Sequence, residues 1–476
     1  MKSSMRKAPL ALAMLTALSL GACATARKAD VALPAAYEAP AGAAPAGAIA
    51  LDTWWTAYSD ADLTALVEQA LARNPDVRTA RSRLDEVKAQ RISAIAQYLP
   101  QGDATGSSRR TKTTQLGGTA VSIPGFSNSG IAINQSANFN VSWEVDPFGR
   151  GLFAGRAASA EVSRARFSYE AARASIAAQT ADAWFQAKGL AIQLADARET
   201  ARIQQDLYDV AEKRARAGLA ATTEPDRVAG DLAQAKAQAT ALEAQLQVEK
   251  RAILILAGRV VEPTANVNAT PEVGQAPAVP TALPSELLER RPDVREAQAL
   301  VRSQVNQKII AQLAFFPSLS LTPGVGWQKI KQPGFSSESK SWTWGGTLTQ
   351  PILSIPRLLA DLKAQDARTE QAVIAYEKTV QTAFQEAESA LVSLDADRRQ
   401  VALLADGEVR ARRAYDAART GYGRGLTDLS TALQAEQSWR AVRTQLTSAE
   451  VQALRRSVQA MKAIGGGWPV QAYAAK

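Results

Sequence analysis

Two copies of one tetrapeptide decide the fold: Pro75-Asp76-Val77-Arg78 and Pro292-Asp293-Val294-Arg295. Each copy opens a helix-like run that ends on Tyr98-Leu99-Pro100 in the first case and Phe315-Phe316-Pro317 in the second. The first and last prolines have the same spacing in both copies, 25 residues. Because such self-similarity marks a duplicated architecture, the sequence predicts two structural repeats of one design.

The repeat continues downstream with a second constant offset. Four further pairs lie 207 positions apart: Tyr169-Glu170 with Tyr376-Glu377, Tyr208-Asp209 with Tyr415-Asp416, Gly218-Leu219 with Gly425-Leu426, and Gly258 with Gly465. We therefore place the first repeat over 51–257 and the second over 285–468. A proline-rich linker over 258–284 joins them, and 469–476 forms a C-terminal tail.

Two proline-free runs predict very long helices. Residues 156–217 contain one glycine and residues 357–420 contain one as well. A continuous helix of that size would be roughly 90 Å long, far beyond the ordinary helix. Both runs stop at a Gly-Leu pair, where glycine is the expected cap, and helical sequence then resumes. We expect a helical hairpin in each repeat, at about 150–257 and about 357–464.

A strict period of two marks residues 131–146. Seven of the eight odd positions are apolar and seven of the eight even positions are polar. Runs of the same type cover about 318–329 and about 342–351, and a weakly patterned partner covers about 102–113. We expect loops at 114–130 and 331–341. The pattern indicates strands with one apolar face, which suits a membrane β-barrel or a half-buried sheet of a soluble domain.

The N-terminal sequence is typical of an export signal. Lys2, Arg6 and Lys7 precede an apolar run over 8–20, which predicts a signal peptide over 1–22. Its ending, Leu20-Gly21-Ala22-Cys23, resembles a bacterial lipobox. That resemblance implies a Cys23 that carries S-diacylglycerol and N-palmitoyl groups, and residues 23–50 as a lipidated tether. Ala24, where inner-membrane lipoproteins usually carry aspartate, points to the outer membrane; the alternative is an ordinary signal peptide with an incidental cysteine.

Composition excludes several functions. The chain has no histidine and one cysteine, which excludes histidine-based catalysis, histidine metal sites and intrachain disulfides. The formal charge of +9 falls to about +6 without the leader, and its basic residues are spread among acidic ones, so we expect no nucleic-acid partner. With no nucleophile–base motif or phosphate loop, we expect neither an enzyme nor a bound cofactor.

The exported context favours the membrane interpretation of the strands. Four strands cannot close a barrel, and an open edge in lipid leaves backbone groups unsatisfied at a cost of several kcal/mol each. The chain must therefore associate with copies of itself, and three copies would supply twelve strands.

Almost the whole mature chain resembles one family. The motifs that carry the resemblance, in order, are Leu51-Asp52-Thr53-Trp54-Trp55, Leu66, Ala70-Leu71, Asn74-Pro75-Asp76-Val77, Trp143-Glu144-Val145-Asp146-Pro147-Phe148-Gly149-Arg150, Arg291-Pro292-Asp293-Val294, Phe316-Pro317 and Lys462-Ala463-Ile464-Gly465-Gly466-Gly467-Trp468. The sequence is similar to TolC-type outer-membrane efflux channels, in the NodT-like lipoprotein branch that serves resistance-nodulation-division (RND) pumps.

The resemblance implies a mainly α fold with a transmembrane β-barrel: a TolC-like homotrimer with four strands per chain in a 12-stranded barrel, on a long α-helical periplasmic tunnel. A mixed equatorial domain would hold the linker and the last segment. The function implied is a passive duct in the outer membrane of a Gram-negative bacterium. It would export small toxic compounds that an inner-membrane RND pump delivers through a periplasmic adaptor protein.

The resemblance also implies two sets of site residues. Gly218, Leu219, Gly425 and Leu426 would form periplasmic tips that meet the adaptor, although the glycines could simply cap helices. Relatives often close the entrance with an aspartate ring, but the matching positions here, Thr431 and Gln434, are not acidic. Asp428 is the carboxylate close by, with Glu436 further along. Asp428 could form a ring that attracts cations, or complement the helix dipole.

Two other functions stay open. A duct of the same fold could serve type I protein secretion, and a periplasmic coiled-coil scaffold would share the long helices but not the barrel. The lipobox and the Gly465-Gly466-Gly467-Trp468 ending favour the efflux branch. A further departure from the family lies at 352–357, where many relatives have a glycine-rich turn before arginine; here we expect Pro356 to start the helix.

Overall fold

The computed structural model describes residues 29–38, 50–114, 116, 130–219, 221–280 and 284–469. They form two compact units, the first built mainly from Val87–Val162 and Ala299–Tyr376, the second from the described parts of Val31–Glu86, Ser163–Gln298 and Glu377–Lys476. Each unit therefore takes segments from both repeats. The expected signal peptide, Cys23, most of the 114–130 loop and residues 470–476 lie outside the described residues.

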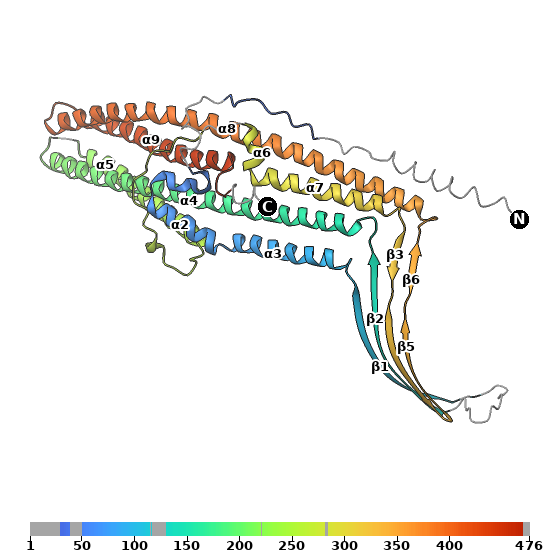
Figure 1. Ribbon diagram of the computed structural model, residues 1–476. Helices are drawn as coiled ribbons and strands as arrows, with labels where there is room; N and C mark the ends of the chain where they lie inside the picture. Colours follow the sequence, from blue (N-terminus) through green and yellow to red (C-terminus); the bar gives the residue numbers. More distant parts are fainter. Residues whose placement is uncertain are drawn as a thin grey trace. The chain divides into compact units, whose positions relative to one another are not determined.

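The helices of the two repeats follow one plan (Figure 1). The first repeat contains η1 (Leu51–Tyr58), α2 (Ala61–Arg73), α3 (Pro75–Ala96), α4 (Arg150–Arg216) and α5 (Glu224–Leu256). The second contains α7 (Pro292–Leu313), α8 (Ile355–Gly423) and α9 (Leu429–Ala463), which correspond to α3, α4 and α5. Three short helices lie between them: η2 (Thr264–Asn266), η3 (Pro284–Glu286) and α6 (Leu287–Arg290).

The long hairpins have the expected positions, with α8 beginning one residue before Pro356. Within the described part of the chain, none of the helices is both long enough and apolar enough to pass through a membrane.

The first unit contains one antiparallel sheet (Figure 1). β1 (Gln101–Thr113) pairs along its whole length with β2 (Gly130–Val145). β2 pairs on its other side with β3 (Ser318–Leu321) and β4 (Gly324–Gln332), which pair in turn with β6 (Gly346–Thr349) and β5 (Phe335–Thr343). β1 at one edge, and β5 with β6 at the other, have no further strand partner among the described residues.

The loop expected at 331–341 is wrong. β4 runs to Gln332 and β5 starts at Phe335, so Pro333 and Gly334 alone form the turn, with Gly334 in the left-handed region at φ 77°. Apart from Phe335, residues 335–341 are polar, which favours a loop. A strand that is exposed on both faces, however, is held by its backbone hydrogen bonds to the neighbouring strand and needs no apolar face. The two strands expected in this repeat are each interrupted once, after Leu321 and after Thr343, so the second repeat has four strand segments.

The register gives the sheet two chemically different faces. Ala104, Phe139, Val325 and Trp342 lie opposite one another across four strands, and the next row is Thr105, Asn138, Gly326 and Ser341. Phe139, Val325 and Trp342 are 47%, 57% and 80% exposed, so the described part of the chain leaves this apolar row uncovered.

One aspartate and one arginine join β2 to the helices of the first unit. The Asp146 carboxylate accepts from the backbone N–H groups of Arg150 (2.8 Å) and Gly151 (2.7 Å), which start α4. The Arg150 guanidinium donates to the carbonyls of Leu313 (3.2 Å) and Phe316 (2.7 Å) at the end of α7. The two side chains thus satisfy backbone groups that a helix end leaves unpaired.

The core of the second unit is rich in tryptophan and alanine. Trp54, Trp184 and Trp468 are almost completely buried. Asp60 caps α2 by accepting from Leu63 N–H, and its second oxygen accepts from Trp184 Nε1 at 2.9 Å. Small residues let the long helices approach closely: a Cβ on Gly189 of α4 would lie 2.6 Å from Val451 of α9.

Part of the expected tether belongs to this unit as well. The Tyr37 ring stacks on Phe384 of α8 at 5.7 Å, and Glu38 N–H donates to Glu388.

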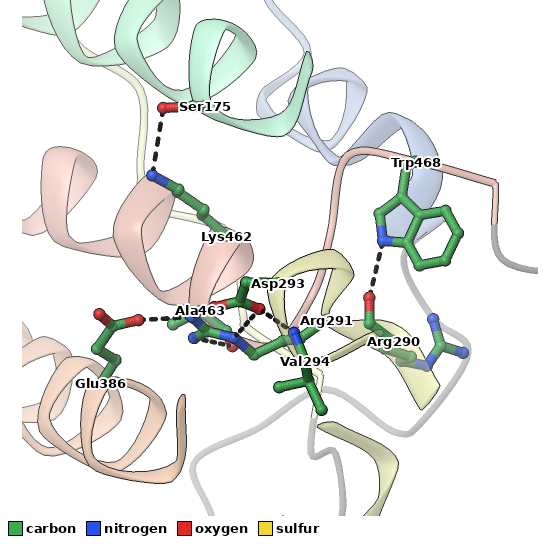
Figure 2. Close-up of polar contacts among 9 residues, drawn as sticks. All are labelled: Ser175, Arg290, Arg291, Asp293, Val294, Glu386, Lys462, Ala463 and Trp468. Atoms are coloured by element: carbon green, nitrogen blue, oxygen red, sulfur yellow. Dashed lines mark hydrogen bonds and ion pairs between the residues drawn. The ribbon is translucent and has the colours of Figure 1, made fainter. Parts of the chain in front are cut away.

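A polar joint in each repeat ties the start of one helix to the end of another. In the first, the Asn74 amide before α3 donates to the carbonyl of Leu256, the last residue of α5. In the second, Arg291 before α7 donates to the carbonyl of Ala463, the last residue of α9 (Figure 2). Leu256 and Ala463 are 207 positions apart, so the two joints are equivalent.

Candidate channel entrance at the hairpin ends

The two hairpin ends have the same backbone geometry. Gly218 and Gly425 lie in the left-handed region, at φ 69° and 74°. Leu219 N–H donates to the carbonyl of Arg214 at 2.9 Å, and Leu426 N–H to that of Gly421 at 2.8 Å. Each glycine N–H bonds three residues back, which completes the Schellman pattern of a capped helix end.

The caps leave the leucines exposed. Leu219 is 72% and Leu426 78% exposed. A Cβ added at Gly218 or Gly425 would meet nothing within 4 Å, so the positive φ alone requires glycine there. Each hairpin thus presents one uncovered apolar side chain at its tip.

Asp428 acts as the N-cap of α9. Its Oδ1 accepts from Thr431 N–H at 2.7 Å, and the side chain is exposed. Hydrogen bonds from the Thr431 hydroxyl and backbone N–H hold the pKa of Asp428 below its usual value. Thr431 and Gln434 are also exposed and follow at intervals of three, so the three candidate gate residues share one side of the helix.

A cluster behind the tips packs the two hairpins together. Its buried members come from four helices: Ile203, Leu207, Ala211, Val228, Tyr415, Tyr422, Leu429, Ala432 and Leu433. Tyr415 stacks on Trp439 at 5.1 Å, and Trp439 Nε1 donates to Glu408. The Arg214 guanidinium lies 5.1 Å from the centre of the Tyr422 ring, a cation–π contact between the hairpins.

A buried glutamate lies beneath this cluster. Glu436 is fully buried, accepts from Gln204 Nε2 of α4 at 2.9 Å, and lies 3.5 Å from Arg440 Nε. Burial raises the pKa of Glu436; Arg440 opposes the rise, Asp231 adds to it and Arg419 opposes it. The sequence alone predicts no role for Glu436, although its position seven residues after Leu429 places it on the buried stripe of α9.

Across the ranges that the structure describes, no group of three or more His, Cys, Asp or Glu side chains could hold a metal ion. The hairpin ends have exposed leucines, capped turns and an exposed polar side of α9.

Solved structures share this fold. The outer-membrane channel OprN matches with a TM-score of 0.80 and 24% identity, over 94% of this chain and 100% of that chain. The MtrE outer membrane channel of Neisseria gonorrhoeae matches with a TM-score of 0.80 and 22% identity, over 93% and 97%. The fold is therefore that of TolC-type outer-membrane channels.

The sequence comparisons specify the family. The model for outer membrane efflux proteins matches residues 66–259 and 283–466, one segment in each repeat. The outer membrane protein OprJ of Pseudomonas aeruginosa is 30% identical over 466 residues, covering 96% of this chain and 95% of OprJ. The cation efflux system protein CusC of Escherichia coli is 27% identical over 421 residues, covering 87% of this chain and 88% of CusC.

The chain belongs to the outer membrane efflux protein family. It is an outer-membrane efflux channel that extends into the periplasm of a Gram-negative bacterium, and these relatives are channels rather than enzymes.

Proposed function

We propose that three copies of this chain form a passive duct for small toxic compounds. The duct receives them from an inner-membrane RND pump through a periplasmic adaptor protein. The single observation that carries the trimer is the sheet of the first unit, which has two open edges and an uncovered apolar row. Backbone groups at such edges need partners in lipid, and copies of the same sheet supply them in a closed barrel of twelve strands.

The hairpin tips support adaptor contact. Leu219 and Leu426 are apolar, exposed and held in place by rigid caps, as a docking surface requires. Replacing both leucines with aspartate should abolish resistance in cells while the trimer and its outer-membrane location persist. Wild-type resistance in that variant would refute adaptor docking at the tips.

Asp428, Thr431 and Gln434 are proposed to line the duct entrance. Because Asp428 also caps α9, two variants separate the roles: Asp428→Asn keeps a capping side chain and removes the charge, whereas Asp428→Ala removes both. If the charge selects ions, both variants should lower cation selectivity in planar bilayers, and Asp428→Asn should do so while the cap of α9 is kept. An unchanged selectivity would leave Asp428 with the cap only.

Lipid anchorage at Cys23 is a separate proposal from the Leu20-Gly21-Ala22-Cys23 ending. Radiolabelled palmitate should enter the wild-type chain and not Cys23→Ala. A labelled Cys23→Ala chain would overturn this assignment.

Deletion of the gene tests the cargo. We expect increased susceptibility to dyes, detergents, antibiotics or metal ions. Unchanged susceptibility to all of them, with lost export of a protein, would favour the type I secretion duct instead. Absence of heat-modifiable trimers from outer-membrane fractions would refute the trimeric duct.

A further inference from the structure

A contact between the repeats at the start of α4 has a counterpart at the start of α8. Phe148 and Arg150 of the first repeat correspond to Ile355 and Arg357 of the second, each 207 positions later. Their targets at the end of α7, Leu313 and Phe316, correspond to Ala96 and Leu99 at the end of α3, each 217 positions earlier. The first set of residues meets within the chain.

The internal contact has a polar and an apolar part. The Arg150 guanidinium donates to the carbonyls of Leu313 and Phe316. The Phe148 and Phe316 rings lie 5.0 Å apart, centre to centre. Together they fix the end of α7 against the start of α4.

The corresponding residues of the second set are exposed. Ile355 is 41% and Leu99 57% exposed. The Arg357 side chain is 75% exposed, and its ion pair with Asp361 of the same helix is long, at 3.9 Å. The end of α3 repeats the local geometry of its counterpart: Leu99 N–H donates to Ala96 at 3.0 Å, as Phe316 N–H donates to Leu313 at 3.1 Å.

The order of the helices in the first unit indicates which helix of a second copy would lie beside α8. α4 packs on α3, since a Cβ on Gly155 would lie 3.6 Å from Ile95, and α4 reaches α7 through Arg150. α7 in turn contacts α8 through the 2.6 Å ion pair of Lys308 with Asp366. The succession is α3, α4, α7, α8, so a ring of copies that continues it places α3 of the next copy beside α8.

We propose that Ile355 and Arg357 bind the end of α3 in a second copy of this chain. Arg357 donates to the carbonyls of Ala96 and Leu99 of the partner subunit, and Ile355 packs on Leu99 of the partner subunit. This inference rests on the proposed trimer and adds the residues that close it. The contact that joins the two repeats within one chain would thus have an equivalent between neighbouring subunits.

One difference sets the expected strength of the two contacts. Arg150 also pairs with Glu144 at 3.3 Å, but the residue 207 positions after Glu144 is Pro351. Arg357 therefore lacks a counterpart of Glu144, and among the described residues its one ion pair is the long contact with Asp361 of its own helix. On heating, we expect the contact between subunits to break at a lower temperature than the contact within the chain.

Cysteine pairing tests the geometry in the full chain. Two variants, Leu99→Cys and Ile355→Cys, are expressed together on separate chains and oxidised in membranes. We expect covalent dimers from the mixture and none from either variant alone. The matched control pairs Leu99→Cys with Leu353→Cys, which is 96% exposed and two residues from Ile355.

Native mass spectrometry of the same samples separates the two hypotheses. If trimers are present but the control pair links as readily as Leu99→Cys with Ile355→Cys, the contact is wrong and the trimer stands. If no trimers are present, the proposed function fails and the contact fails with it.

Substitution of the arginines tests the strength. Arg357→Ala should lower by several degrees the temperature at which the trimer dissociates into folded monomers. Arg357→Lys should restore only part of the loss, because an ammonium cannot reproduce the guanidinium fork. Arg150→Ala should instead destabilise each chain. Equal dissociation temperatures for Arg357→Ala and wild type would overturn the role of Arg357.

Discussion

The joints of the two repeats have the same geometry and different chemistry. In the first, the neutral Asn74 amide donates to Leu256 at 3.0 Å and Asn74 Oδ1 accepts from Asp76 N–H. In the second, the Arg291 guanidinium donates to Ala463 at 3.1 Å and forms ion pairs with Asp293 and Glu386 (Figure 2). The residue 207 positions before Glu386 is Gln179, also neutral.

The difference teaches what the duplicated fold requires. The carbonyl at the end of the return helix needs a donor in both repeats, and a short amide suffices. The second repeat adds charge to the same place, with an arginine whose side chain is 10% exposed between carboxylates that are 41% and 54% exposed. In both repeats a side chain donates to the last carbonyl of the return helix, whereas the ion pairs are specific to the second repeat.

Glycine substitution should have the largest effect. A Cβ on Gly465 would lie 2.7 Å from the backbone carbonyl of Arg290, and a Cβ on Gly258 would lie 2.8 Å from the Arg73 side chain. Both glycines have positive φ, at 86° and 68°. We expect Gly465→Ala to cost about 4 kcal/mol of unfolding free energy and Gly258→Ala about 2 to 3 kcal/mol. Thermal loss of helical circular dichroism in detergent measures both, and a larger loss of stability for Gly258→Ala would contradict the predicted order.

Loss of the joint donors should follow in size. Arg291→Ala leaves the buried carbonyl of Ala463 without its donor and removes two ion pairs. We expect it to lower the unfolding free energy by about 2 to 3 kcal/mol, a value that allows for the solvent exposure of the two carboxylates. Asn74→Ala removes one donor and one helix cap, for about 1 to 2 kcal/mol. Chemical denaturation would contradict the comparison if Asn74→Ala proved the more damaging.

A chemical exchange sharpens the comparison further. Arg291→Asn with Glu386→Gln gives the second joint the neutral side chains of the first. We expect the double variant to be more stable than Arg291→Asn alone by about 0.5 to 1 kcal/mol, because Glu386 no longer lies unpaired. Its stability should also vary less with salt than that of wild type. A double variant no better than the single one would mean that Glu386 contributes little.

The smallest expected effect is a dependence on pH that belongs to the second repeat. Glu436 of α9 has Ala229 as its counterpart 207 positions earlier. Because burial raises the pKa of Glu436, the folded state binds its proton more tightly than the unfolded state. Its contribution to stability is full below the ordinary pKa of 4.5 and is lost as pH rises through the raised pKa. Glu436→Gln should flatten this dependence, and an unchanged pH profile would refute it.

The elements with strong periodicity could be predicted from the sequence. The proline-free runs gave the long hairpins, and the alternation over 131–146 gave β2, because each pattern persists over many residues. β5 was missed over 335–341, where its partner in β4 lies across a two-residue turn and neither face is buried in this chain. No local pattern distinguishes such a strand from a polar loop.

The candidate site was predictable in part. Gly218 and Gly425 predict the helix caps at the tips, because a backbone with positive φ favours glycine. The capping role of Asp428 is established by the hydrogen bond that its carboxylate accepts from Thr431 N–H, which the sequence alone does not show. The pairing of Gln204 with Glu436, 232 residues apart, could not be read from spacing, because it depends on which faces of two helices meet.

The division of each compact unit between the repeats also constrains how the protein is made. β2 pairs with β4, whose first residue is Gly324, long after Val145 has been synthesised and exported. Until then the hairpin of β1 and β2 has an open edge and an uncovered Phe139. Such non-local pairing forms slowly and exposes aggregation-prone edges. Until the second hairpin pairs with it, the first hairpin therefore keeps an aggregation-prone edge.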